Sequence, residues 1–135
     1  MRWSWCKTCL TLILVVACVR TTVREYYPSP DNPRYTPERG GVAVREYLRL
    51  RCPELAKPPA RDSATLLARV RVDSAGLATG AQLDGTSGDA VMDGVIGTVV
   101  AQLDLSANTP RRDEYQARIA YACRDSVSAR IDITP

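Results

Sequence analysis

The sequence predicts a two-layer α+β domain, in which one helix packs on a mostly antiparallel sheet of three to five strands. Two observations on residues 64–105 lead to this prediction. The first half alternates apolar and polar residues around a turn at 73–76, as half-buried strands do. The second half repeats apolar residues every three or four positions, as an amphipathic helix does. Two further alternating stretches follow, so the strands and the helix are expected to share one core.

The first residues predict export. Arg2 and Lys7 precede an apolar run over 10–17. The run is too short for a bilayer, which needs about 20 residues, but it suits the apolar region of a secretory signal. It ends with a small alanine directly before Cys18, which resembles the lipobox of bacterial lipoproteins, where the cysteine is lipidated after cleavage. We expect residues 1–17 to be a signal peptide and Cys18 to carry a lipid; the alternatives are an ordinary signal with an unrelated cysteine and a weak membrane anchor that starts at Trp3.

Residues 18–41 predict an extended linker between that anchor and the domain. Four prolines interrupt regular pairing and favour extended chain, and Gly40-Gly41 ends the stretch. Fully stretched at ~3.1 Å per residue, the linker would reach roughly 70 Å. The folded domain is then expected to occupy residues 42–135.

Five stretches of the domain predict strands. Val42–Leu50 alternates apolar and polar residues, and Cys52-Pro53 is expected to end this first strand. Leu66 to Val72 alternates in the same way, and Gly76 supplies a turn into a return strand over 77–83. The last two strands are expected from alternating residues, which are Tyr115, Ala117, Ile119 and Tyr121, then Val127, Ala129 and Ile131.

The helix is expected to begin near Ser87, a residue suited to the N-cap position, and to end near Leu103. Gly94 and Gly97 lie inside it and cost about 1 kcal/mol each relative to alanine. Two explanations remain open: close packing against the sheet, or a marginal helix.

The stretch from Val70 through the Asp73–Gly76 turn, followed by Ser87-Gly88 and the Met92-Asp93 pair, resembles the TonB C-terminal domain family. The resemblance spans about residues 58–123. It departs from the family in lacking the Tyr-Pro before the first core strand and the Phe-x-Pro after the helix. The resemblance implies a periplasmic domain that receives a segment of an outer-membrane protein beside its sheet by strand addition.

On this resemblance, the binding edge is expected at the final two strands. Its residues are Tyr115, Ala117, Ile119, Tyr121, Val127, Ala129 and Ile131. The chain lacks a long apolar segment for a transmembrane anchor, so we expect a lipid-tethered adaptor in envelope transport rather than an energy transducer. The alternative is a structural envelope lipoprotein whose domain self-associates into a homodimer.

Two cysteines remain after the predicted signal and anchor, Cys52 and Cys123. Because the bacterial envelope is oxidising, we expect them to form a disulfide; the alternative is two buried free thiols.

Catalytic chemistry is not expected. The chain has no histidine to activate Ser87, and Asp89 replaces the second glycine of a G-x-S-x-G elbow. The acidic residues Asp84, Asp89 and Asp93 do not match a calcium loop. We therefore predict no catalytic residue, metal or cofactor, and the net charge of +3 does not by itself indicate nucleic acid binding.

Overall fold

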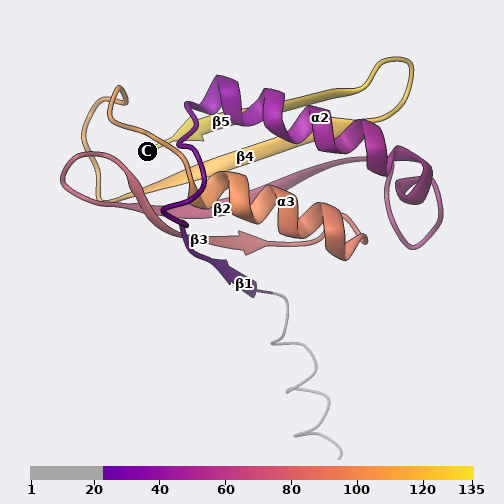
Figure 1. The fold of residues 1–135 in the computed structure, drawn as a ribbon, viewed down its shortest axis with the longest axis horizontal. Coiled ribbons are helices and arrows are strands. Elements are labelled where there is room, and N and C mark those ends of the chain that lie inside the picture. The colour runs from indigo at the N-terminus through magenta and orange to yellow at the C-terminus, as the bar shows by residue number, and fades with distance from the viewer. Residues whose placement is uncertain (1–22) are drawn as a thin grey trace, which may run out of the picture.

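The computed structural model describes residues 23–135, which form a five-stranded antiparallel sheet with two helices on one face (Figure 1). This confirms the predicted α+β class, although the sheet carries two helices and not one. The expectations for residues 1–17 and Cys18 lie outside the described residues. The elements in chain order are β1 (Val23–Tyr26), α2 (Pro37–Leu55), β2 (Ser63–Val72), β3 (Ala78–Asp84), α3 (Ala90–Ala101), β4 (Glu114–Ala122) and β5 (Ser128–Thr134).

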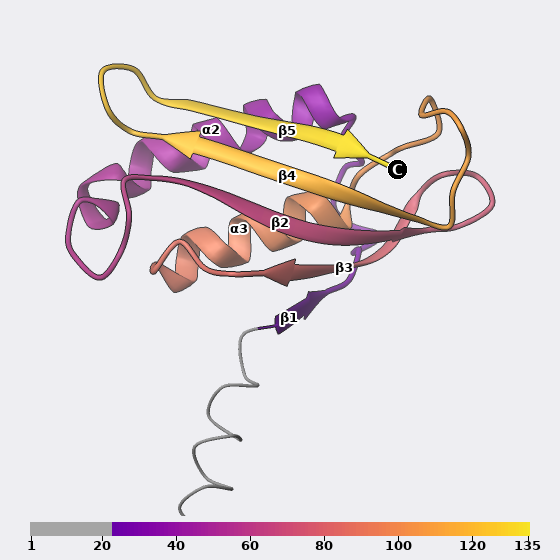
Figure 2. The ribbon, with the colours of Figure 1, turned by 180° about the vertical axis from the view of Figure 1, so that it is seen from behind.

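The strands lie in the order β1-β3-β2-β4-β5, and every neighbouring pair is antiparallel. Figure 2 shows the sheet from the face without helices, with β1 and β5 as its opposite rims. The helices cover only one face of the sheet. This explains why apolar and polar residues alternate along the sequence, because every second residue of β2 and β4 points into the core. Leu66, Ala68 and Val70 are buried as predicted.

The prediction of a strand over Val42–Leu50 is wrong, because these residues belong to α2. Thr36 caps this helix, its hydroxyl accepting a hydrogen bond from the Arg39 N–H at 3.3 Å, and Pro37 occupies the first turn, where proline is favoured. Val44 and Leu48 are buried. Their spacing of four residues fits a helix face and a strand face equally, which explains the error.

The prediction of a linker over residues 18–41 is wrong for its described part. β1 pairs with β3, with Val23 opposite Asp84 and Tyr26 opposite Ala81. The folded domain therefore begins at least nineteen positions before the predicted boundary at Val42 (42 minus 23). Proline does not prevent this, because β1 ends before Pro28.

The buried side chain of Gln102 holds the proline-rich loop between β1 and α2. Its Oε1 accepts the Ser29 N–H at 2.6 Å. Its Nε2 lies 3.0 Å from the Asn32 carbonyl oxygen and 3.2 Å from those of Ser29 and Pro33. One amide thereby satisfies backbone groups that have no regular pairing of their own, so the loop is ordered without being helix or strand.

The two glycines of α3 have different roles. A Cβ added at Gly97 would overlap the ring of Tyr26, whereas one added at Gly94 would meet nothing within 4 Å. Close packing therefore explains Gly97, and through it the docking of β1 against α3. The helix cap also differs from the expectation, because Asp89 and not Ser87 accepts the N–H of Met92.

Candidate functional site

The predicted binding edge is wrong for the four residues on β4, because this strand lies between β2 and β5. Tyr115, Ala117, Ile119 and Tyr121 are at most 3% exposed and point toward the helices as part of the core. The sequence placed them on a strand correctly, but β5 covers the side of β4 that was expected to be open.

The two core tyrosines use their hydroxyls within the domain. The Tyr121 hydroxyl donates to the Arg61 carbonyl at 2.9 Å, and burial raises its pKa. The Tyr115 hydroxyl donates to the Pro110 carbonyl and accepts the Arg112 N–H, both at 3.1 Å. Both residues therefore stabilise the loops at the two ends of β4 and are not available to a partner.

β5 is the outermost strand, and its backbone direction follows from the pairing of β4. The Cys123 N–H donates to the Asp62 carbonyl, on the β2 side. Backbone groups alternate in direction along an antiparallel strand, so the even-numbered residues of β4 pair with β5. Their partners are the even-numbered residues of β5, among them Arg130 opposite Ala120. The odd-numbered residues of β5, which are Ala129, Ile131 and Ile133, therefore point their N–H and C=O groups outward.

These outward groups form the β5 edge, and helix α2 lies over part of it. No helix, loop or side-chain group within residues 23–135 hydrogen-bonds to the backbone of Ala129, Ile131 or Ile133. A Cβ at Gly41 of α2 would lie 3.1 Å from the Ala129 carbonyl oxygen and 3.7 Å from the Ile131 backbone nitrogen, so the helix lies over these two outward groups. Thr134, at the other end of the edge, is exposed.

Of the predicted edge residues outside β4, Ala129 and Ile131 do lie on β5, whereas Val127 precedes the strand. Their side chains face the helices: Ile131 is buried against Gly40, and Ala129 is half-buried. Their side chains are therefore not available to a partner, and α2 lies against part of their backbone.

The opposite rim is less open. β1 has only four residues, and it pairs with the last four of β3. Beyond it, the Arg34 guanidinium donates to the Ala78 carbonyl at 2.7 Å, and the Ala78 N–H donates to the Leu103 carbonyl at 2.9 Å. A side chain and a loop therefore already occupy part of the β3 edge that β1 leaves uncovered, a common way to protect sheet edges.

The Cys52 and Cys123 sulfurs lie 2.17 Å apart, with their Cα atoms separated by 5.8 Å. The pair is at disulfide distance, as expected from the cysteine count. It links the last turns of α2 to the residue that follows β4, beside the hairpin that leads into β5.

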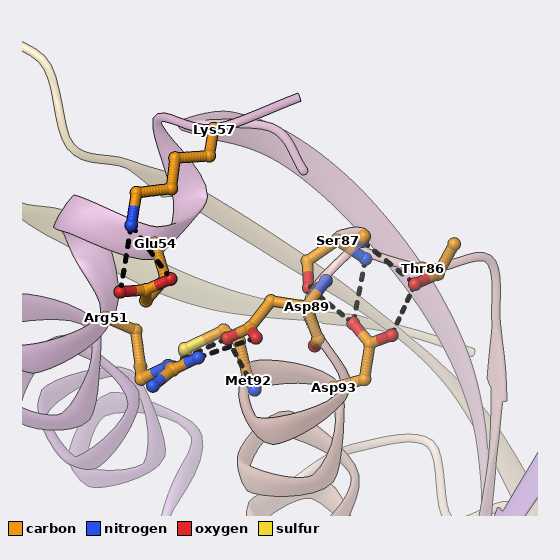
Figure 3. A network of polar contacts seen from close by, with 9 residues as sticks. Arg51, Glu54, Lys57, Thr86, Ser87, Asp89, Met92 and Asp93 are labelled. Carbon is orange, nitrogen blue, oxygen red and sulfur yellow. Dashed lines mark hydrogen bonds and ion pairs between the residues drawn. The ribbon is translucent and has the colours of Figure 1, made fainter. Parts of the chain in front are cut away.

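Figure 3 shows the polar network at the start of α3. Asp93 is only 2% exposed. Its Oδ1 accepts the Ser87 N–H at 2.7 Å and the Ser87 hydroxyl at 2.6 Å, and its Oδ2 accepts the Thr86 hydroxyl. Ser87 is itself fully buried, so its hydroxyl serves to hold the loop before α3 and is not presented to a substrate.

Asp89 connects this network to α2 (Figure 3). Its carboxylate accepts two hydrogen bonds from the Arg51 guanidinium, at 2.7 and 2.9 Å, and one from the Met92 N–H at 3.2 Å. The Arg51 hydrogen bonds are the main cause that lowers the Asp89 pKa, with the Met92 N–H adding to them. This bidentate pair joins the C-terminal half of α2 to the N-terminus of α3.

The acidic cluster considered from the sequence is dispersed: Asp84 is exposed on the sheet, Asp89 pairs with Arg51, and Asp93 binds Ser87. No group of three metal-ligating side chains is found among residues 23–135. Neither helix within this range is both long and apolar enough to span a bilayer.

The described surface includes an open hollow on the sheet and a smaller one between the helices. The open one, of about 610 Å³, lies on the face without helices, over small residues of β2, β4 and β5 such as Thr65, Ala120 and Ser128. The smaller one, of about 230 Å³, is lined by Tyr35, Tyr47 and their neighbours.

Sequence reasoning missed Arg51 and Gln102, which join elements distant in the chain. For α2 there was a signal: Thr36-Pro37-Glu38 is a helix start, with a capping hydroxyl, proline at the first position and an acid in the first turn. For Gln102 no local signal exists, because the neighbouring sequence does not distinguish a buried glutamine from an exposed one.

No family model, curated protein or solved structure matches the chain. The likeness to the TonB C-terminal domain therefore rests on the sequence features described above.

Proposed function

We propose that the chain is a non-enzymatic envelope lipoprotein whose TonB-like domain binds a protein segment by strand addition. It would act as a periplasmic adaptor in envelope transport, tethered through a lipid on Cys18. The single observation that carries the proposal is the β5 edge, where the outward backbone groups of Ala129, Ile131 and Ile133 form no hydrogen bond within residues 23–135.

Strand addition needs such an edge, because main-chain hydrogen bonds supply the affinity and alternate side chains supply the specificity. Side chains of an added strand would alternate between the open face, beside Arg130 and Asp132, and the helix face, beside α2. The partner is therefore expected to be an extended segment, not a folded surface.

Site-specific photo-crosslinking in cells tests the proposal. A photoreactive residue at Thr134, on the β5 edge, is expected to crosslink to another envelope protein, whereas one at Glu25, on β1, is not. Ile133→Pro removes an outward N–H without removing a bond to β4, so it is expected to abolish the Thr134 crosslink. Ile133→Ala keeps that N–H and is expected to retain it.

Circular dichroism of each variant is expected to show that the fold is kept. Crosslinks that are equally strong at Glu25, or that persist in a folded Ile133→Pro variant, would contradict strand addition at β5.

The same edge supports a second candidate, self-association, because the β5 backbone of one copy can pair with that of another. Light scattering of the purified domain separates the two. A stable homodimer that Ile133→Pro converts to monomer, together with Thr134 crosslinks only between copies, would favour the structural lipoprotein.

A further inference from the structure

We propose that the β1 rim of the domain faces the lipid bilayer, and that the β5 edge consequently points away from it. The β1 rim is defined as Val23–Tyr26 with Ala90, the exposed first residue of α3. This inference rests on lipidation of Cys18, which is part of the proposed function, and it commits the rim to one partner, a phospholipid surface.

The chain between the lipid on Cys18 and the first strand of the sheet is short. From Cys18 to Val23 the chain advances five residues (23 minus 18). At no more than ~3.6 Å per residue, these cover roughly 18 Å in their most extended conformation. The long tether expected from the sequence does not exist, because most of its residues belong to β1, the clamped loop and α2.

The sheet is wider than this length of chain. β1 and β5 are separated by four strand-to-strand spacings, which at ~4.8 Å each amount to about 19 Å, before side chains are counted. Figures 1 and 2 both show the two strands on opposite rims. A tether of at most about 18 Å attached to β1 cannot cross the sheet, so the β5 edge cannot be turned down onto the membrane.

Charge does not set this orientation. Arg24 and Glu25 are both exposed on β1 and have opposite signs, and Asp84, opposite Val23, is also exposed. Among residues 23–135 these charges leave no net positive patch on the rim, so the covalent tether is what holds it at the membrane. The orientation is therefore expected to be insensitive to ionic strength, in contrast to an electrostatically bound domain.

A tryptophan placed at either of two positions can show how close each rim lies to the membrane. Ala90 precedes Gly97 by seven residues, two helical turns, and therefore lies on the side of α3 that packs on Tyr26 of β1. Ser126 is exposed in the turn between β4 and β5, on the opposite rim. The only tryptophans of the chain are Trp3 and Trp5, which lie inside the predicted signal. A mature chain with one added tryptophan therefore has a single tryptophan as the donor for fluorescence energy transfer.

The test measures energy transfer from that tryptophan to dansyl-labelled lipid headgroups. Ala90→Trp and Ser126→Trp are purified as lipoproteins and placed in phosphatidylethanolamine–phosphatidylglycerol vesicles. Ala90→Trp is expected to lose the larger share of its emission, and added salt is expected not to restore it. Insertion of about 20 Gly/Ser residues before Thr21, spanning ~25 Å on average, is expected to make the two variants equal.

Equal transfer without the insertion, or stronger transfer from Ser126→Trp, would overturn the inference. The mass of the purified chain separates this failure from that of the proposed function. A lipidated chain with equal transfer refutes only the orientation, and the β5 crosslinks remain a separate test. A chain without lipid on Cys18 refutes the anchor and the orientation together.

Discussion

The carboxylate of Asp89 caps α3 and pairs with Arg51 of α2, so one residue joins both helices. We expect Asp89→Asn to lower the free energy of unfolding at pH 7 by about 1–2 kcal/mol, because asparagine keeps the cap but loses the charged bidentate pair. Chemical denaturation over a pH series measures this.

The pH dependence has a definite sign. The Asp89 pKa is lowered in the folded state, so its stabilisation is complete above the ordinary aspartate value of about 3.9 and disappears as pH falls through the lower folded value. The difference between wild type and Asp89→Asn is therefore expected to shrink below pH ~4. A difference that stays constant down to strongly acidic pH would show that the charge is not what matters.

Gln102 allows a second prediction at the scale of one residue. Gln102→Met keeps the approximate volume but leaves the Ser29 N–H and the Asn32 and Pro33 carbonyls without their side-chain partner, whereas the Ser29 carbonyl keeps the Asn32 N–H. We expect a loss of about 2–4 kcal/mol in urea denaturation, since buried polar groups without hydrogen bonds are costly. Gln116→Met, on the exposed face of β4, is the matched control and is expected to change stability by less than about 0.5 kcal/mol. Equal effects of the two substitutions would contradict the clamp.

At the scale of elements, the contact between β1 and α3 depends on the absence of one side chain. Gly97→Ala is expected to destabilise the domain by about 1–3 kcal/mol, because the new methyl overlaps the Tyr26 ring. Gly94→Ala enters open space and is expected to stabilise the helix by up to about 1 kcal/mol. Thermal unfolding of both variants measures the contrast.

A double substitution identifies the cause. In a Tyr26→Ala background, Gly97→Ala is expected to lose its cost, because the overlapping ring is gone. If the cost persists there, the glycine is needed for a reason other than the docking of β1.

Local patterns predict some elements of this fold and not others. The strands β2, β4 and β5 and the helix α3 follow from their periodicity, because each presents one face to the core. α2 was misread because Val44 and Leu48 fit both periods. β1 was missed because its place depends on Gly97 and Gln102, distant residues that no local window contains. The candidate edge was assigned to β4 as well as to β5 for the same reason: alternation identifies a strand but not its neighbours in the sheet.

At the scale of the molecule, the Cys52–Cys123 pair closes a loop with a sequence separation of 71. Mass spectrometry without reductant is expected to show the two residues linked. Reduction, or a Cys52→Ala/Cys123→Ala variant, is expected to cost about 4 kcal/mol of unfolding free energy through the freedom regained by the unfolded chain. Rapid labelling of both thiols in the native, unreduced protein would refute the link.

The clamp on the β1–α2 loop has a mechanical consequence. A pull on the N-terminus reaches β1 first, and its four residues would be peeled from β3 one hydrogen-bonded pair at a time, the weak loading direction for a strand. The load would then meet the amide of Gln102, which holds the loop at several backbone points at once. This side chain is therefore where a stretched tether would stop unravelling, leaving α2 and the β5 edge intact beyond it.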